Sequence, residues 1–125
     1  MKAVLSNFKQ SPRKVRLVAD MIRGKNVSAA KDALLFLPKK SAPEMIKLLN
    51  SAIANARQKG MNPDELVVKS VSVDKGTVLR RYTPKARGRG AAIRRAMSHV
   101  VLELGEGAQK TKPARAAKTA KAKTQ

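Results

Sequence analysis

The chain has 125 residues, and its 28 Lys and Arg against eight Asp and Glu give a formal net charge of +20. This length predicts one domain with a modest core. So many like charges destabilise a compact state unless an anionic partner neutralises them. The absence of Cys excludes disulfides, zinc ribbons and thiol catalysis.

The composition limits the partner and the location. No apolar run approaches the roughly 18 residues of a membrane span, and the N-terminus lacks the apolar core of a signal peptide. Phe8, Phe36 and Tyr82 are the whole aromatic content, which argues against stacking of unpaired bases. We therefore expect a cytoplasmic protein whose anionic partner is nucleic acid or a membrane surface. Contacts with nucleic acid would be made through phosphate, through its shape and through the planes of arginine side chains.

A short edge strand is expected at residues 2–8, followed by three helices. The first begins at Pro12, with Ser11 as its N-cap, and ends before Gly24. Its apolar face is predicted to contain Val15, Val18, Ala19 and Ile22, with Leu17 and Met21 widening it.

The second helix is expected at about residues 28–37, because Pro38 stops it. The third begins at Ser41, where Glu44 would complete a capping box, and it runs to Gly60. Its predicted buried face consists of Met45, Leu48, Leu49, Ala52, Ile53 and Ala56.

Two segments, 65–81 and 97–104, alternate valine or leucine with polar residues and are predicted to be the strands of a hairpin centred near Ala86. That centre would pair Val68 with Leu104, Lys69 with Glu103, and Val71 with Val101. The middle of the hairpin, about residues 75–98, would project on the order of 30 Å at ~3.3 Å per residue. Because isolated ribbons are marginal in water, we expect a partner to hold it.

The predicted fold class is α+β, with three helices packed on a small antiparallel sheet and a long projecting basic β-hairpin. Residues 1–104 form the single domain, and residues 105–125 are rich in Lys, Ala and Thr. This tail contains no bulky apolar residue and is expected to be disordered.

No constellation of residues indicates catalysis. His99 is the one histidine, and no carboxylate lies near it in the sequence, so we expect it to pack on the sheet or contact phosphate. Asp64 and Glu65 are the only adjacent acids and match no metal site, and the glycines of 88–90 lack the spacing of a phosphate loop. We predict no enzymatic activity, no metal and no cofactor.

The basic segments do indicate a function. From Lys75 to Leu102 the chain has no acidic residue, and between residues 80 and 96 there are six Arg and one Lys. An ordinary solvated surface mixes both signs of charge. Arginine also presents a planar fork that suits bidentate phosphate contacts. The hairpin is therefore predicted to bind nucleic acid, with a weaker indication at the start of the first helix, "PRKVR".

Three blocks, "SPRKVRLVADMIRGKNVSAA", "LLNSAIANA" and "RRYTPKARGRGAAIRRAMSH", resemble the L-twenty-two family of large-subunit ribosomal proteins. The resemblance covers about residues 5–104, in the order and spacing of the family. The most specific positions are Lys14, Val15, Arg16, Ile22, Arg23 and Gly24 in the first helix, and Arg81, Pro84, Ala86, Gly88, Arg89, Ser98 and His99 in the hairpin.

The resemblance implies a monomer within the large ribosomal subunit that contacts the large ribosomal RNA and neighbouring ribosomal proteins, and that supports subunit assembly. The implied RNA-binding residues are Arg13, Lys14, Arg16, Arg23, Lys25, Arg80, Arg81, Lys85, Arg87, Arg89, Arg94, Arg95 and His99.

The hairpin of such a protein would reach along the peptide exit tunnel and meet the nascent polypeptide. The implied tunnel-lining tip consists of Leu79, Arg80, Arg81, Tyr82, Thr83, Pro84, Lys85, Ala86, Arg87, Gly88, Arg89 and Gly90. Two positions depart from the family pattern. Lys85 stands where Arg is common, and Gly90 stands where Ala is common, which predicts a more flexible tip.

Two other readings were weighed. A histone-like architectural protein would act as a dimer on the DNA minor groove, with Pro84 as a wedge. The order of the predicted elements, three capped helices before a single asymmetric hairpin, argues against a histone-like protein. A protein of the membrane surface would need an amphipathic helix with a basic face, which neither the hairpin nor the tail provides.

Overall fold

The computed structural model describes residues 1–107. Its elements in chain order are β1 (Lys2–Phe8), α1 (Pro12–Ile22), α2 (Val27–Leu35), α3 (Ala42–Gln58), a 3₁₀ turn (Pro63–Glu65), β2 (Leu66–Pro84), a second 3₁₀ turn (Ala86–Gly88) and β3 (Gly90–Glu106). The three strands are antiparallel in the order β1-β3-β2. The predicted α+β class is confirmed. Strand β3 runs two residues past its predicted end, and most of the predicted disordered tail, from residue 108 on, lies outside the described residues.

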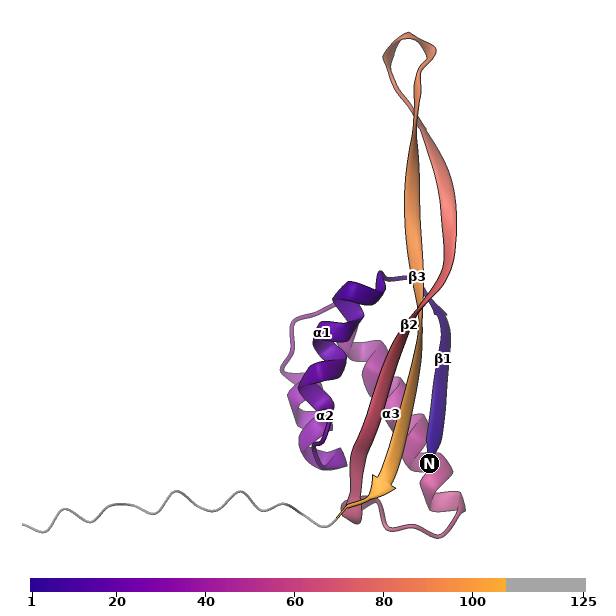
Figure 1. The fold of residues 1–125 in the computed structure, drawn as a ribbon. Coiled ribbons are helices and arrows are strands. Elements are labelled where there is room, and N and C mark those ends of the chain that lie inside the picture. Colours follow the sequence, from indigo (N-terminus) through magenta and orange to yellow (C-terminus); the bar gives the residue numbers. More distant parts are fainter. Residues whose placement is uncertain (108–125) are drawn as a thin grey trace, which may run out of the picture.

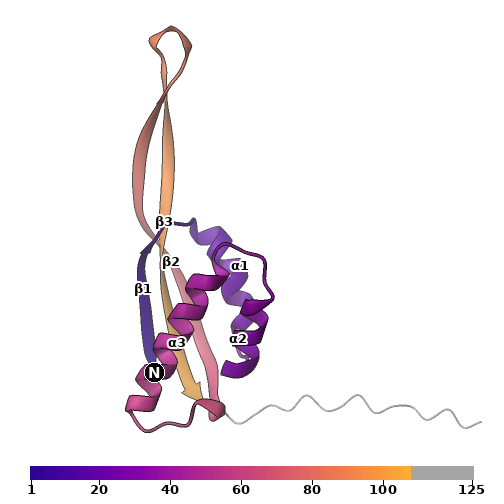
Figure 2. The same ribbon diagram turned by 180° about the vertical axis from the view of Figure 1, so that it is seen from behind.

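The helices lie along one half of the sheet, and the other half of β2 and β3 extends well beyond them (Figures 1 and 2). This division follows the distribution of apolar residues. Those of the three helices pack against the lower parts of the strands, and the fully buried side chains include Val15, Ile22, Leu34, Met45, Leu49, Leu66, Val68, Val100 and Leu102. The core therefore belongs to the body, and the hairpin leaves it.

Helix α1 buries the predicted Val15, Val18, Ala19 and Ile22, but the prediction for its flank is wrong. Leu17 and Met21 are 65% and 41% exposed. The buried apolar face of α1 is thus limited to one narrow stripe, and the flank formed by Leu17 and Met21 is exposed.

Helix α3 buries five of the six predicted residues, and Ile53 is partly buried at the edge of the core. The predicted capping box is wrong. Ser41 has helical backbone angles (φ −82°, ψ −15°), so its side chain makes no capping bond, and its hydroxyl is buried without a partner in the described chain. Glu44 instead contacts Lys47 one turn later at 3.0 Å. Ser11 likewise makes no side-chain capping bond, although Pro12 does stand at the start of α1.

Two β-bulges in β2 explain why the predicted register is only partly right. Val68 pairs with Leu104 as expected, but Ser70 pairs with Glu103 and Val71 with Leu102. The first bulge, between Val68 and Ser70, leaves Lys69 without the predicted partner, and a second follows between Lys75 and Val78. Each bulge adds one residue to β2 opposite an unchanged β3. The last pair of the hairpin is consequently Pro84 with Gly90, and the turn is centred on Arg87 rather than Ala86.

Candidate nucleic-acid interface

The projecting part of the hairpin is a two-stranded ribbon. Strand β1 accompanies β3 only as far as the pair of Phe8 with Ser98, and the ribbon then continues from Val78–Ala96 to Pro84–Gly90. Every residue from 80 to 90 is exposed. No other element within residues 1–107 covers these side chains.

The strand register distributes the arginines over both faces of the ribbon. Arg80 stands directly opposite Arg94 in the antiparallel pair. Like charges placed directly opposite one another destabilise a sheet. The two ion pairs within residues 1–107, Asp20 with Arg23 and Glu44 with Lys47, both lie in the helices. The ribbon therefore holds a repulsion that no carboxylate of the described chain relieves.

Arg81 and Arg95 occupy the other face. Arg81 pairs with Ile93, and Arg95 pairs with Leu79, two residues earlier in β2, so alternation places both guanidinium groups on the same side. A polyanion that contacts the ribbon on either face would thus meet two arginines. An arrangement with arginine on both faces suits a partner that surrounds the hairpin better than one that lies along a single side.

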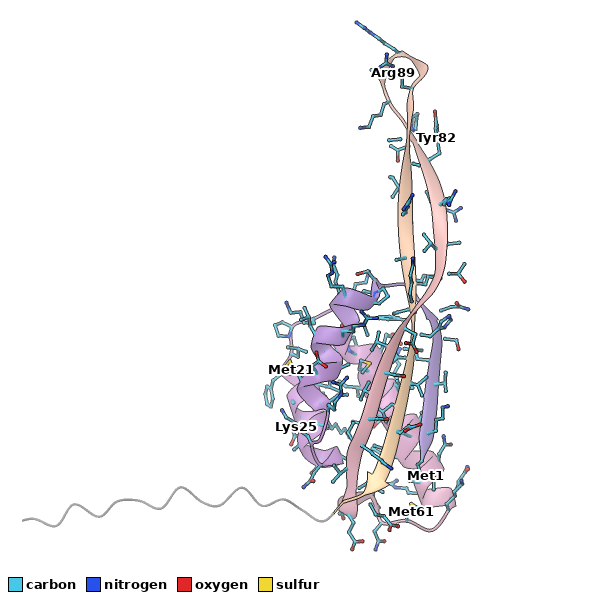
Figure 3. The ribbon with its side chains drawn as sticks, viewed as in Figure 1. Met1, Met21, Lys25, Met61, Tyr82 and Arg89 are labelled. Carbon is cyan, nitrogen blue, oxygen red and sulfur yellow. The ribbon has the colours of Figure 1, made fainter. Side chains whose placement is uncertain are left out.

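The tip is a tight turn closed by the backbone. The N–H of Lys85 donates to the carbonyl oxygen of Arg89 at 2.7 Å. Arg87 and Gly88 both adopt left-handed backbone angles, with φ of 59° and 67°. This conformation is uncommon for a residue with a side chain, so Gly88 is well suited to its place and Arg87 bears some strain. Figure 3 shows Arg89 at the far end of the molecule from the body.

Tyr82 and Gly90 form a close contact across the ribbon just below the tip. A Cβ atom at Gly90 would overlap the ring of Tyr82, which therefore lies directly against the glycine backbone. Such packing of an aromatic ring over a cross-strand glycine stabilises a hairpin. The greater tip flexibility expected from Gly90 stays a prediction, and the structure adds a different role for this glycine: it provides space for the ring, and its φ is not positive.

The Gly90→Ala variant is expected to displace the Tyr82 ring and to increase its mobility. Because the chain has one Tyr and no Trp, the fluorescence anisotropy decay of tyrosine reports on this side chain alone. We expect a lower anisotropy in Gly90→Ala and no change in the neighbouring Ala91→Ser variant. Equal anisotropy in wild type and Gly90→Ala would contradict the contact.

Two of the predicted RNA-binding arginines have a structural role at the free edge of β2. Arg16 donates from Nε and Nη2 to the carbonyl oxygen of Val73, at 3.1 and 3.0 Å. Arg23 donates from Nη2 to the carbonyl oxygen of Val71 at 2.9 Å. Further down the same edge, the chain after α1 pairs with Val68 through backbone hydrogen bonds of 2.9 Å. The edge that would otherwise template pairing with another chain is thus covered within the body.

Arg16 therefore differs in its hydrogen bonding from Arg13, which is exposed and makes no side-chain hydrogen bond in the described chain. Arg16→Ala is expected to lower the free energy of unfolding by about 1–2 kcal/mol, because it removes charge-assisted hydrogen bonds to a part-buried carbonyl. Arg13→Ala should change it by less than about 0.5 kcal/mol. Urea unfolding of both variants at one salt concentration is the measurement, and equal destabilisation would argue against the edge contact.

The remaining predicted residues are not all near the hairpin. Lys14 is exposed in the first turn of α1, close to the hairpin base. Lys25 lies beyond the other end of α1, far from the tip (Figure 3). His99 lies at the base of the hairpin, where its Nδ1 accepts a hydrogen bond from the backbone N–H of Asn7 at 3.1 Å. Its ring also rests against Gly76, where an added Cβ would lie 3.1 Å from Nε2.

Two basic residues near the base of the hairpin were missed by the sequence prediction. Lys9 and Lys40 line a cavity of about 590 Å³ together with the predicted Lys14, Arg81 and Arg95. Lys9 and Lys40 lie in connections between elements, where no periodic pattern marks them. The fold brings them to the base of the hairpin, and a one-dimensional pattern carries no signal of that proximity.

The described part of the chain also bears on metal binding and membrane spanning. Residues 1–107 contain no cluster of three or more His, Asp or Glu side chains that could hold a metal ion. No helix among them is both long enough and apolar enough to cross a bilayer.

Both a family model and individual proteins of known sequence are similar to this chain. The model of a family described as Ribosomal protein L22p/L17e matches residues 3–105. The chain is 51% identical over 107 residues to the large ribosomal subunit protein uL22 of Herpetosiphon aurantiacus, covering 85% of this chain and 95% of that protein. It is 50% identical over 105 residues to the proteins of the same name from Citrifermentans bemidjiense and a Geobacter species, covering 83% of this chain and 95% of each.

Proposed function

The chain belongs to the L22p/L17e family of ribosomal proteins, and on this premise we propose that it binds the large ribosomal RNA in the cytoplasm as a constituent of the large subunit. Its hairpin would line the path of the nascent polypeptide, and its binding would support subunit assembly. Membership of a family of structural ribosomal proteins confirms that the chain is not an enzyme.

One observation supports RNA binding most strongly: the hairpin holds Arg80 opposite Arg94 with no acidic residue from Lys75 to Leu102. This arrangement destabilises the free protein and is relieved by phosphate. Since arginines occupy both faces of the ribbon, RNA on more than one side explains the pattern better than a single flat contact. The narrow ribbon and its small turn also suit a confined passage.

The body would contribute a second set of contacts. Arg13 and Lys14 are exposed in the first turn of α1, and Lys14 lines the cavity at the hairpin base. Lys25 lies beyond the opposite end of that helix. Arg16 and Arg23 are half engaged with β2, so their remaining N–H groups would supply any phosphate contact. His99 would present Nε2, since its Nδ1 already accepts a hydrogen bond. Neighbouring ribosomal proteins would be further partners of a chain that is a monomer within the subunit.

Co-sedimentation tests the assignment to the subunit. A tagged copy of the full chain, produced in cells during subunit assembly, is expected to sediment with the large subunit and to remain with it through a high-salt wash. Release by the wash, or equal recovery with small subunits, would oppose the proposal. An equal outcome for wild type and a dimeric basic DNA-binding protein would favour the architectural alternative, whose dimer would also show in size-exclusion chromatography.

The tunnel position is tested by crosslinking. A photoreactive residue in place of Thr83 or Arg87 is expected to crosslink to a nascent chain in stalled ribosomes. The same probe at Lys31, on the exposed side of α2, is the matched control and should not react. Crosslinks from Lys31 but none from the tip would place the nascent chain elsewhere.

A further inference from the structure

We propose that the cavity at the base of the hairpin is a binding site for one nucleotide unit of an RNA backbone, with the phosphate held by basic side chains from both body and hairpin. This inference rests on the proposed RNA binding and specifies where a single backbone unit is held. It concerns a site that includes Lys9 and Lys40, which the sequence patterns did not indicate.

Four separate parts of the chain form the cavity. Lys9 comes from the connection after β1, Lys14 from the first turn of α1, Lys40 from the connection between α2 and α3, and Arg81 and Arg95 from the two strands of the hairpin. The cavity volume is about 590 Å³, which is within the usual range for sites of small ligands. A bare phosphate would leave much of that space empty, whereas a phosphate with its ribose would fill more of it.

The charge of the cavity wall is of one sign. Five basic side chains line it and no Asp or Glu does. The first turn of α1 also contains no acidic residue, so the positive end of the helix is not neutralised there. The side-chain oxygen of Gln10, another lining residue, is buried without a hydrogen-bond partner in the described chain. A half-turn of that carboxamide would present its NH₂ group, a donor, in place of the oxygen.

The apolar part of the wall fits the rest of a nucleotide unit. Leu79 and Met97 line the cavity beside the two arginines. A ribose has an apolar face that can pack against such side chains, while its phosphate is held by the guanidinium forks and ammonium groups. A free inorganic anion would use the basic groups alone. The combination therefore favours a phosphate with an attached sugar.

Two other cavities show that basic side chains alone do not define such a site. One, of about 350 Å³, is lined by Lys2, Lys59 and Lys69, but Glu103 shares its wall and offsets the charge. The other, of about 500 Å³, has Lys31 and Arg57 as its two cations and is shaped mostly by one face of α3. Among these three, the cavity at the hairpin base has the most cations, five against three and two, has no carboxylate, and is the one that joins the body to the hairpin.

Occupancy of this site would connect the hairpin to the body. Beyond the pair of Phe8 with Ser98, the ribbon is connected to the body only by its own two strands within residues 1–107. No side-chain hydrogen bond or ion pair in this part of the chain joins the helices to Arg81 or Arg95. A bound phosphate would be shared by Lys14 or Lys40 on one side and by an arginine on the other. The RNA backbone would then supply the contact that the protein lacks.

The direct test is an NMR titration of the full chain with a ribonucleoside 5′-monophosphate and, separately, with inorganic phosphate. We expect saturable amide shifts at Gln10, Ser11 and Lys14, with roughly three- to tenfold tighter binding of the nucleotide than of phosphate. Lys40→Gln and Arg95→Gln should each weaken nucleotide binding about three- to tenfold. The matched control, Lys31→Gln, removes the same charge at the cavity on α3 and should leave it unchanged. Shifts spread evenly over all basic segments without saturation, or an equal response in the Lys40→Gln variant, would overturn the site.

A second arm separates this inference from the proposed function. Binding of the large ribosomal RNA is measured for wild type, Lys31→Gln, and the double variant Lys40→Gln with Arg95→Gln. A loss of about tenfold or more in the double variant beyond that in Lys31→Gln supports the site. RNA affinity equal to that of Lys31→Gln would overturn the site and leave the proposed function standing. If wild type does not bind this RNA, the proposed function fails, and the use of the site by RNA fails with it.

Discussion

The triple variant Arg81→Ala, Arg87→Ala, Arg89→Ala is expected to bind the large ribosomal RNA on the order of 100-fold more weakly at about 0.1 M salt, while the body melts at an unchanged temperature. Each lost phosphate contact removes about one unit from the slope of log affinity against log salt, so the slope should fall by roughly 2–3. The melting of the body should be unaffected because these residues are exposed and lie outside the hydrophobic core. Filter binding across a salt series and circular dichroism melting measure the two effects.

The matched control replaces Lys2, Lys31 and Lys59 with alanine. This control lowers the net charge by the same amount, from +20 by three, at exposed positions away from the hairpin. We expect a much smaller loss of affinity, since only general electrostatic attraction changes. Equal losses in the two triple variants would show that total charge, and not the hairpin, determines binding. A large drop in the melting temperature of the arginine variant would show that the hairpin contributes to the core.

Leu49→Ala is expected to destabilise the body without altering the RNA contacts, and to lower the free energy of unfolding by about 2–5 kcal/mol. Leu49 is fully buried in α3, so the substitution removes apolar contacts and leaves a cavity. A small domain is stable by only about 5–15 kcal/mol, and this loss is a large share of it. The salt slope of RNA binding by the folded fraction should not change, because no phosphate contact is altered.

Leu35→Ala provides the control with the same chemical change. Leu35 is 61% exposed at the end of α2, and its truncation should alter the free energy of unfolding by less than about 0.5 kcal/mol. Urea unfolding of both variants, followed at 222 nm in one buffer of fixed salt, gives the comparison. A similar loss in the free energy of unfolding for Leu49→Ala and Leu35→Ala would contradict a core between the helices and the sheet.

The helices and strands were predictable because their apolar residues recur with the periods of the two structures. Four buried positions of α1 and five of α3 follow directly from that spacing, whereas the exposure of Leu17 and Met21 on α1 did not. The register was less predictable, since the bulges at Lys69 and near Gly76 depend on local backbone geometry and have no strong sequence signal. The capping of α3 failed for a related reason. The backbone of Ser41 is already helical, which turns the hydroxyl away from the first turn.

The candidate site was likewise predictable only in part. An uninterrupted run without acidic residues identified the hairpin, because that property is contained in the sequence itself. The double role of Arg16 could not be foreseen, since an arginine beside an apolar stripe looks the same whether it faces solvent or a strand edge. The contribution of Lys40 to the basal cavity depends on how the connection before α3 folds back toward β2 and β3, which only the tertiary structure reveals.

The second bulge of β2 has a mechanical consequence. It lies between Lys75 and Val78, where β1 ends and the ribbon begins, so any change of backbone angle at this point would be transmitted to the whole projecting segment. The seven paired residues from Val78 to Pro84 give an arm of roughly 23 Å at ~3.3 Å per residue. A change of about 10° at this point would then move the tip by about 4 Å on the same arm. The close packing of Gly76 against the ring of His99, where an added Cβ would lie 3.1 Å from Nε2, means that a larger residue at position 76 would bear on the backbone at the start of this arm.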